Sequence, residues 1–333
     1  MAYPDLTTVI ASPASIAIAG ATTTTSYSDA FTPEIWKDEM VLSRENKLAL
    51  VKHFKRLNHK GSVGDTVYLM LIDHMSAVDK AAGVEVDPQT LTTGRMAVTI
   101  DSHKTVSVLI EDMASQQSIV NIRREFTREG GYALAKALED AVWTAIVAGL
   151  HADYKVVGAD GSTAFAAGNF SDITDAGLRK AIQTLEDNNT DMGKVKLFIP
   201  PSQKNALLGI DKFTLYNYIG RTSELQRGEF GNIYGIPVVV TTNAPHMSDA
   251  GAITTAALGT GRLAMLASSE AVCVAPQWDV RFQSQYEVRY LGTRVVGDMC
   301  YGIKCLRVSN ADLASPTAAS STRLSEIVGL YVK

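Results

Sequence analysis

Residues 112–149 read DMASQQSIVNIRREFTREGGYALAKALEDAVWTAIVAG. Apolar residues recur along this stretch at steps of three, four or seven, which is the spacing of one face of an α-helix. Asp112 or Ser115 can cap the start of the helix, and Gly149 can end it. About 35 residues at ~1.5 Å each form a rod of roughly 50 Å, which is long for a globular domain. Inside it, Gly130–Gly131 marks either a bend or a place of close packing.

Strand-like segments precede this predicted helix. Gly61 and Gly64 open a strand at Thr66–Ile72, and a second stretch rich in β-branched residues runs over Met96–Ile110. We expect the two to pair. The connection Asp73–Gly94 exceeds twenty residues, which is longer than connections inside compact domains usually are. The sequence therefore predicts a projecting loop here.

The second half alternates helix and strand patterns. A helix is expected over Asp172–Asn188, followed by a buried strand and by a short helix that opens with proline, the residue favoured in a first turn. The expected later elements are the strand Val195–Ile199, the helix Pro200–Leu208, strands Ile236–Thr241 and Leu263–Val274, and one long alternating strand Val280–Val295 that continues near Tyr301–Val308. The fold class is therefore α+β.

The first 35 residues are rich in Thr, Ser and Ala and contain three prolines, a composition that cannot close a core of its own. We expect an extended arm, followed by a short helix over about 33–50. The segment Val9–Ala21 has some likeness to a secretion signal, but the first basic residue is Lys37, so export is disfavoured.

The net charge and the number and spacing of the cysteines exclude some classes of function. The 333 residues contain 31 Lys and Arg against 35 Asp and Glu, a net charge of -4, which argues against gripping nucleic acid as the main task. Three cysteines form no even disulfide framework and lack zinc spacing, which fits free thiols in a reducing cytoplasm. No apolar run approaches the ~20 residues that span a bilayer.

Motifs for catalysis are weak. Gly259–Ala264 matches G-x-G-x-x-A, but the residues after it have a strand pattern, so a turn between strands explains the glycines better than a dinucleotide site does. His53 and His59 lie six apart and do not share a helix face as a zinc pair would. We expect no catalytic, cofactor or metal site, and no enzymatic activity.

Two groups of basic residues are candidate contacts. Lys52, Lys55, Arg56 and Lys60 could touch DNA or an acidic partner, although a solvated helix end explains them as well. Arg123, Arg124 and Arg128 on the polar face of the long helix could bridge to a neighbouring subunit or be solvated.

The order of these parts resembles the major capsid proteins of tailed bacteriophages, with the Hong Kong 97-type fold, and among them the coats of short-tailed podophages. The telling stretches are Gly61–Val67, Ile100–Asp112, Arg123–Arg128 and Ala133–Ala135, in that order around the long loop. The resemblance implies an arm and short helix (1–60), an extended loop hairpin with a peripheral strand (61–110), a spine helix (111–150), an axial domain (151–280), return strands of the peripheral domain (281–314) and a C-terminal tail (315–333).

The resemblance also implies function. It predicts a coat protein that is made in the host bacterial cytoplasm and self-assembles into pentamers and hexamers of an icosahedral shell around double-stranded DNA. Scaffolding protein, portal and a decoration protein are expected partners, with weak nonspecific DNA contact and no membrane. The apolar Ile327–Val332 tail could clasp a neighbour. Expected inter-subunit contacts are Trp36, Glu85, Asp87, Arg95, Arg123, Arg124, Arg128 and Tyr331. The alternatives are an encapsulin nanocompartment on the same fold and, remotely, a dinucleotide-binding oxidoreductase.

Overall fold

The computed structural model describes residues 16–18, 21–23, 45, 48–57, 64–72, 77–86, 88, 93–117, 122–150, 152–210, 231–254, 261–306 and 326–333. The chain divides into two units, one of residues 1–43 and 118–120 and the other, here the main body, of the rest. In the first unit, β1 (Ile16–Ile18) and β2 (Ala21–Thr23) pair antiparallel. The fold below is that of the main body.

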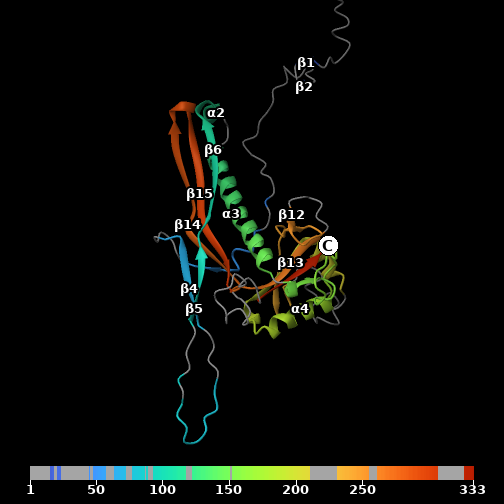
Figure 1. Ribbon diagram of the computed structural model, residues 1–333. Helices are drawn as coiled ribbons and strands as arrows, with labels where there is room; N and C mark the ends of the chain where they lie inside the picture. Colours follow the sequence, from blue (N-terminus) through green and yellow to red (C-terminus); the bar gives the residue numbers. More distant parts are fainter. Residues whose placement is uncertain are drawn as a thin grey trace, which may run out of the picture. The chain divides into compact units, whose positions relative to one another are not determined.

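A four-stranded sheet runs beside the long helix (Figure 1). Its order is β3 (Lys55–Arg56), β14 (Val272–Glu287), β15 (Gly292–Cys305) and β6 (Ser102–Glu111). The predicted single strand over 280–295 is wrong: a 3-10 turn, η4 (Val288–Tyr290), reverses the chain and makes β14 and β15 an antiparallel hairpin.

The predicted long helix is described as α2 (Asp112–Gln117) and α3 (Ile122–Gly149). The glycine pair in α3 serves close packing, because a Cβ on Gly130 would lie 3.2 Å from the ring of Phe282 on β14. A Cβ on Gly297 of β15 would lie 2.4 Å from the same ring. Phe282 thus lies between helix and sheet where only glycine leaves room. Further along α3, Leu134, Trp143 and Ile146 are buried.

A separate hairpin precedes the sheet. Its strands are β4 (Thr66–Ile72) and β5 (Thr93–Thr99), which pair from Thr66–Thr99 to Ile72–Thr93. The pairing of the two predicted segments is confirmed, but the stretch 96–110 is two strands, since the chain turns at Ile100–Asp101 and β6 pairs with β15 instead. Val98 is fully buried against Cys273 and Ala275, which fixes the base of the hairpin to the body.

An eight-stranded mixed sheet forms the second core. Its path is β12-β11-β13-β8-β10-β9, with β16 pairing β13 and β7. The strands are β7 (Lys155–Val157), β8 (Val195–Ile199), β9 (Asn232–Ile233), β10 (Ile236–Val240), β11 (His246–Met247), β12 (Ile253–Thr254), β13 (Gly261–Ser268) and β16 (Ile327–Val332).

The two helices that the sequence predicts in this region pack on the sheet. α4 (Asp175–Asp187) begins at Thr174, whose side chain accepts a hydrogen bond from the Gly177 amide, and it buries Leu178 and Leu185. Pro200 precedes α5 (Pro201–Leu208), which follows β8. Short 3-10 turns, η2 (Ala152–Tyr154) and η3 (Met192–Lys194), lead into β7 and β8.

The C-terminal strand corrects one expectation. β16 lies between β13, to which it is antiparallel, and β7, to which it is parallel, and all six of its residues are buried. Tyr331 has no exposed surface; its ring stacks on Phe165 with centroids 4.0 Å apart. In this conformation neither Tyr331 nor the 327–332 tail can clasp a neighbour, because the chain's own core already covers them.

Two further predictions fall partly outside the described residues, and the structure contradicts the parts that it describes. Most of the expected helix at 33–50 lies outside the described residues, and residues 48–50 are not helical. Gly259 and Thr260 also lie outside the described residues, while Gly261–Ala264 forms the start of strand β13. A dinucleotide fingerprint needs a helix at that point, so the structure contradicts the oxidoreductase alternative.

Candidate inter-subunit surfaces

The loop joining β4 and β5 is the first candidate surface. Glu85 lies in it, and every residue of 77–86 is exposed, including Val78, Val84 and Val86. Its neighbour Asp87 lies outside the described residues. Figure 1 shows the loop extending from the hairpin. Apolar side chains on a segment that makes no core of its own are features of a binding surface.

The strands of the same hairpin present a second exposed group. The Arg95 guanidinium lies 4.9 Å from the centre of the Tyr68 ring, a cation–π arrangement that holds both side chains on the strand surface. Tyr68 and Met70 are exposed. Arg95 is thus available at a surface, as an inter-subunit contact requires.

The three helix arginines have partners within their own chain. Arg123 donates to Ser284 Oγ at 2.9 Å. Arg128 lies within ion-pair distance of Glu45 (3.2 Å), Glu125 (3.7 Å) and Glu129 (3.5 Å). Arg124 is exposed and also has an interaction within the chain. Arg123 and Arg128 thus join the helix to Ser284 and Glu45, so any bridge from them to another copy would have to compete with those contacts.

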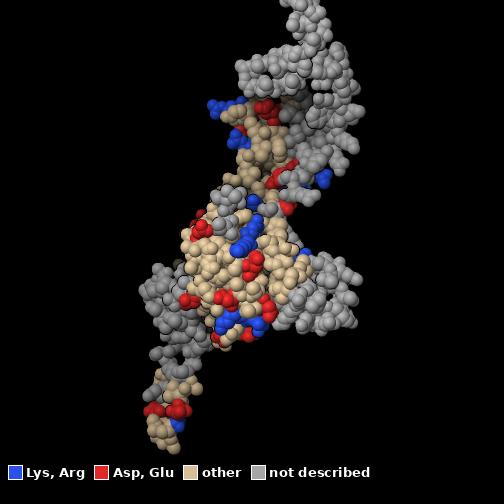
Figure 2. Space-filling view, turned by 90° about the vertical axis from the view of Figure 1, so that its right-hand side faces the viewer, with Lys and Arg blue, Asp and Glu red and all other residues tan. Residues whose placement is uncertain are grey.

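The basic residues of the run are exposed where the structure describes them. Lys52, Lys55 and Arg56 are exposed, but they lie in a turn and in β3 rather than at a helix end, and Arg56 pairs with Asp279 at 2.6 Å. Lys60 lies outside the described residues, as does Trp36. On the face drawn in Figure 2, Lys and Arg lie among Asp and Glu and do not gather into one basic patch.

A third surface was missed from the sequence. We call it the β14–β15 tip: five large apolar side chains exposed at the hairpin turn and on the adjoining α2, namely Met113, Tyr286, Val288, Tyr290 and Leu291. The sequence there contains no turn residue before Gly292, so it has the pattern of a continuing strand. Gly292 itself was the one available signal of a turn.

Between tip and core, a polar network ties three strands together. Asp298 of β15 accepts two hydrogen bonds from the guanidinium of Arg281 (2.8 and 2.9 Å) and one from Trp278 Nε1 (3.0 Å). His103 Nε2 of β6 lies 3.2 Å from the same carboxylate. The Arg281 hydrogen bonds are the main reason that the pKa of Asp298 falls to about 2. The network lies where β14 shifts register against β15, between Pro276 and Arg281.

The buried carboxylate of Glu139 holds the segment that begins at residue 48 by hydrogen bonds to its backbone. Glu139 of α3 is 1% exposed and accepts hydrogen bonds from the amides of Ala49 (3.4 Å) and Leu50 (3.2 Å). Burial raises the pKa of Glu139, and the two backbone amides oppose that rise. Nearby, buried His53 has its Nε2 2.9 Å from Ala267 O, and burial lowers its pKa.

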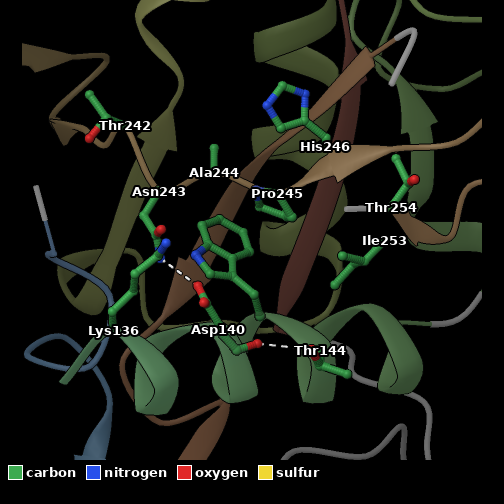
Figure 3. A pocket seen from close by; sticks show the side chains of 11 residues that line it. Lys136, Asp140, Thr144, Thr242, Asn243, Ala244, Pro245, His246, Ile253 and Thr254 are labelled. Carbon is green, nitrogen blue, oxygen red and sulfur yellow. Dashed lines mark hydrogen bonds between the residues drawn. The ribbon is translucent and has the colours of Figure 1, made fainter. Parts of the chain in front are cut away.

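The cleft beside α3 is the first candidate for a catalytic site, because polar and titratable side chains line it (Figure 3). Its volume is about 450 Å³, and its walls include Lys136, Asp140 and His246. Asp140 accepts a hydrogen bond from Asn243 Nδ2 at 2.9 Å, and His246 Nε2 lies 3.0 Å from Arg262. Burial, and secondarily Arg262, lowers the pKa of His246. Asp140 and His246 thus each contact a different polar side chain, and no hydrogen bond between described residues of the cleft pairs a nucleophile with a base.

Neither a metal centre nor a membrane-spanning helix is present among the described residues. No group of three or more His, Cys, Asp or Glu side chains among them is arranged to hold a metal ion. Nor does any helix within the described ranges combine the length and apolar character that a membrane span needs.

Solved structures with the same fold include capsids of phages. The chain resembles a structure of Mycobacterium phage Che8 (TM-score 0.66, 19% identity, 90% of this chain and 97% of that one) and the capsid of cyanophage P-SCSP1u (TM-score 0.68, 16% identity, 94% and 97%). The capsid of Ralstonia phage GP4 matches at a TM-score of 0.66 with 15% identity over 94% and 98%. The fold is therefore the Hong Kong 97-type capsid fold.

Sequence comparison gives the family. No curated protein matches the chain significantly. The family model described as phage capsid protein matches residues 95–307, from β5 through β15. That range is well over half of the sequence, and it contains the long helix, most of the mixed sheet and the β14–β15 hairpin. A particular closeness to podophage coats stays a prediction. This chain belongs to the phage capsid protein family.

Proposed function

We propose that the chain is the major coat protein of a tailed phage, and that its copies join as pentamers and hexamers into an icosahedral shell around double-stranded DNA. Membership of the capsid family supports this. The observation that carries the proposal is the loop 77–86, which is exposed at every residue and bears three valines that belong to none of the apolar cores of the described residues. A second copy would cover such side chains and offset the entropy of ordering the loop.

The parts then have separate roles. We infer that residues 1–60 act as an arm, 61–110 as the extended loop and 111–150 as the spine, while 151–280 and 281–314 form the axial and peripheral domains. The 315–333 segment acts differently from expectation, because its strand β16 belongs to the chain's own core. Scaffold, portal and decoration proteins are proposed partners, with weak DNA contact through Lys52 and Lys55. Synthesis takes place in the bacterial cytoplasm, and the chain has no catalytic role.

The loop is the direct test. Residues 77–88 are replaced by a short turn that leaves β4 and β5 intact, and the product is expressed and examined by electron microscopy. We expect a folded subunit that forms no stable shells. A companion variant keeps the length but changes Val78, Val84 and Val86 to Ser, and it should weaken shells without removing the loop. Normal particles from both variants would refute this role of the loop.

A further inference from the structure

The cleft beside α3 contains a buried hydrogen-bond donor without an acceptor. Trp143 of α3 lines the cleft and is 1% exposed, and its Nε1 is buried with no partner among the described residues. An indole nitrogen can only donate, so an acceptor for it has to enter the cleft from elsewhere. Because nearly all buried donors in folded proteins are paired, the unpaired Trp143 indicates a ligand that brings an oxygen acceptor.

His246 supplies a second donor of the same kind. Its Nε2 lies 3.0 Å from Nη2 of Arg262, and a guanidinium can only donate, so Nε2 is the acceptor of that bond. The lowered pKa of His246 favours the neutral ring, which then carries its proton on Nδ1. That Nδ1 is also buried without a partner among the described residues. The cleft therefore offers two N–H groups that need oxygen acceptors.

The charges of the cleft favour a monoanion. Lys136 lines it from α3, one helical turn before Asp140, and its ammonium group has no hydrogen-bond or ion-pair partner among the residues that the structure describes (Figure 3). Asp140 already accepts a hydrogen bond from Asn243 at 2.9 Å. The ammonium can balance one negative charge, whereas the Asp140 carboxylate would repel a dianion more strongly. A carboxylate supplies two acceptor oxygens for a single charge.

The remaining walls suit a small apolar body. Ala244, Pro245 and Ile253 line the cleft, and Figure 3 shows the segment Thr242–His246 facing α3 across it. The volume of about 450 Å³ lies within the range of ~300–1,000 Å³ that small-molecule sites occupy. Such sites combine apolar walls with a few polar groups that orient the ligand. The cleft has both.

We propose that this cleft binds a small organic monocarboxylate, for whose oxygens Trp143, His246 and Lys136 supply the hydrogen-bond donors. The apolar part of the ligand lies against the apolar walls. The site involves neither the loop 77–86 nor a second copy of the chain. The inference therefore goes beyond the proposed function and can fail independently of it.

Butyrate is the probe, and the indole N–H of Trp143 reports on its binding. The unassembled full-length subunit, with its three tryptophans labelled with ¹⁵N, is titrated with butyrate while the Nε1–H resonances are followed by NMR. Trp36→Phe and Trp278→Phe assign the other two resonances and leave the lining of the cleft unchanged. We expect a saturable shift of the Trp143 resonance and none at Trp278. Butyramide, which lacks the charge, should bind about tenfold more weakly or less, and inorganic phosphate should cause no shift.

Lys136→Met tests the charged donor. It keeps most of the aliphatic length and should raise the dissociation constant of butyrate about tenfold, with little change for butyramide. Lys180→Met is the matched control, because this exposed lysine lies on α4 and is not among the described residues that line the cleft. It should leave the affinity for butyrate unchanged.

Three results would overturn the proposal: a Trp143 resonance that does not move with butyrate, one that moves equally with butyramide or phosphate, and an affinity that Lys136→Met leaves unchanged. None of them bears on the coat function, since single subunits are measured. A chain that binds butyrate but forms no shells would remove the proposed function and leave this inference standing.

Discussion

At the residue scale, Asp298 shows what a side chain in a three-strand network contributes. Its pKa of about 2 lies below the ordinary 3.8, chiefly through Arg281. A depressed carboxyl pKa means that the folded state favours the charged form. The resulting stabilisation is complete above about pH 4 and is lost as the pH falls towards 2.

Asp298→Asn should lower the free energy of unfolding of the subunit at pH 7 by about 1–3 kcal/mol, because it removes the charge that Arg281 and Trp278 bond to. It should also flatten the loss of stability between pH 4 and 2. Urea unfolding at several pH values measures both. Asp279→Asn, which alters the half-exposed pair with Arg56, should cost less than about 1 kcal/mol. Equal effects of the two substitutions would contradict the role given to the network.

Single contacts were the hardest feature to predict from the sequence. Arg128 was a candidate bridge, and its nearest carboxylate outside the helix, that of Glu45, could be found only from the fold. The tip residues were missed because the alternation of Tyr286, Val288 and Tyr290 is equally typical of a half-buried strand. Charge and hydropathy patterns identify the residue types of a contact, but not which side chains remain uncovered.

At the scale of elements, prediction succeeded where a local signal was strong. α4 has its apolar face and Thr174 cap, and α5 has its proline start, so both follow from sequence spacing. The division of 96–110 and the turn at 288–291 depend on which strand each half pairs with, a long-range fact. The six apolar residues of β16 fit a buried strand by length alone, yet their late position favoured a free tail.

Tyr331 tests whether β16 belongs to the core. Tyr331→Ala should cost about 3–5 kcal/mol of subunit stability, because it removes a buried ring that stacks on Phe165. Tyr331→Phe keeps the ring and loses only a long hydrogen bond to Gly251 O (3.4 Å), so it should cost under about 1 kcal/mol. Denaturant unfolding of the unassembled subunit gives both values. An alanine variant with unchanged subunit stability but failed assembly would instead support the prediction that residues 327–332 bind a neighbouring copy.

At the scale of the whole molecule, the fold class and family could be predicted because the order of parts is characteristic even where no motif is. The long helix and most of the mixed sheet follow one another within residues 95–307, the range that the family model matches. The order of the elements could not predict which surfaces of neighbouring copies contact one another. That information lies in surfaces such as the tip.

Mature particles should be held together without covalent bonds between copies. The three cysteines are free thiols; burial raises the pKa values of Cys273 and Cys305 to about 11, so neither forms a reactive thiolate readily. Denaturing gels, run with and without reductant, should therefore show one band at the monomer mass. A ladder of high-mass species that persists in reductant would contradict this, and a ladder that reductant removes would implicate the thiols.

The place of β16 in the mixed sheet has a consequence for synthesis. β13 and β7 precede it by many residues, yet each bonds to residues 327–332. Until residues 327–332 have been synthesised and have left the ribosomal tunnel, the edges of β13 and β7 that bind β16 stay unpaired. Leu263 and Val156 then lack the side chains of β16 that cover them in the folded subunit. Synthesis of residues 327–332 thus has to precede completion of the mixed sheet, and a chain truncated before them lacks the strand that joins β13 to β7.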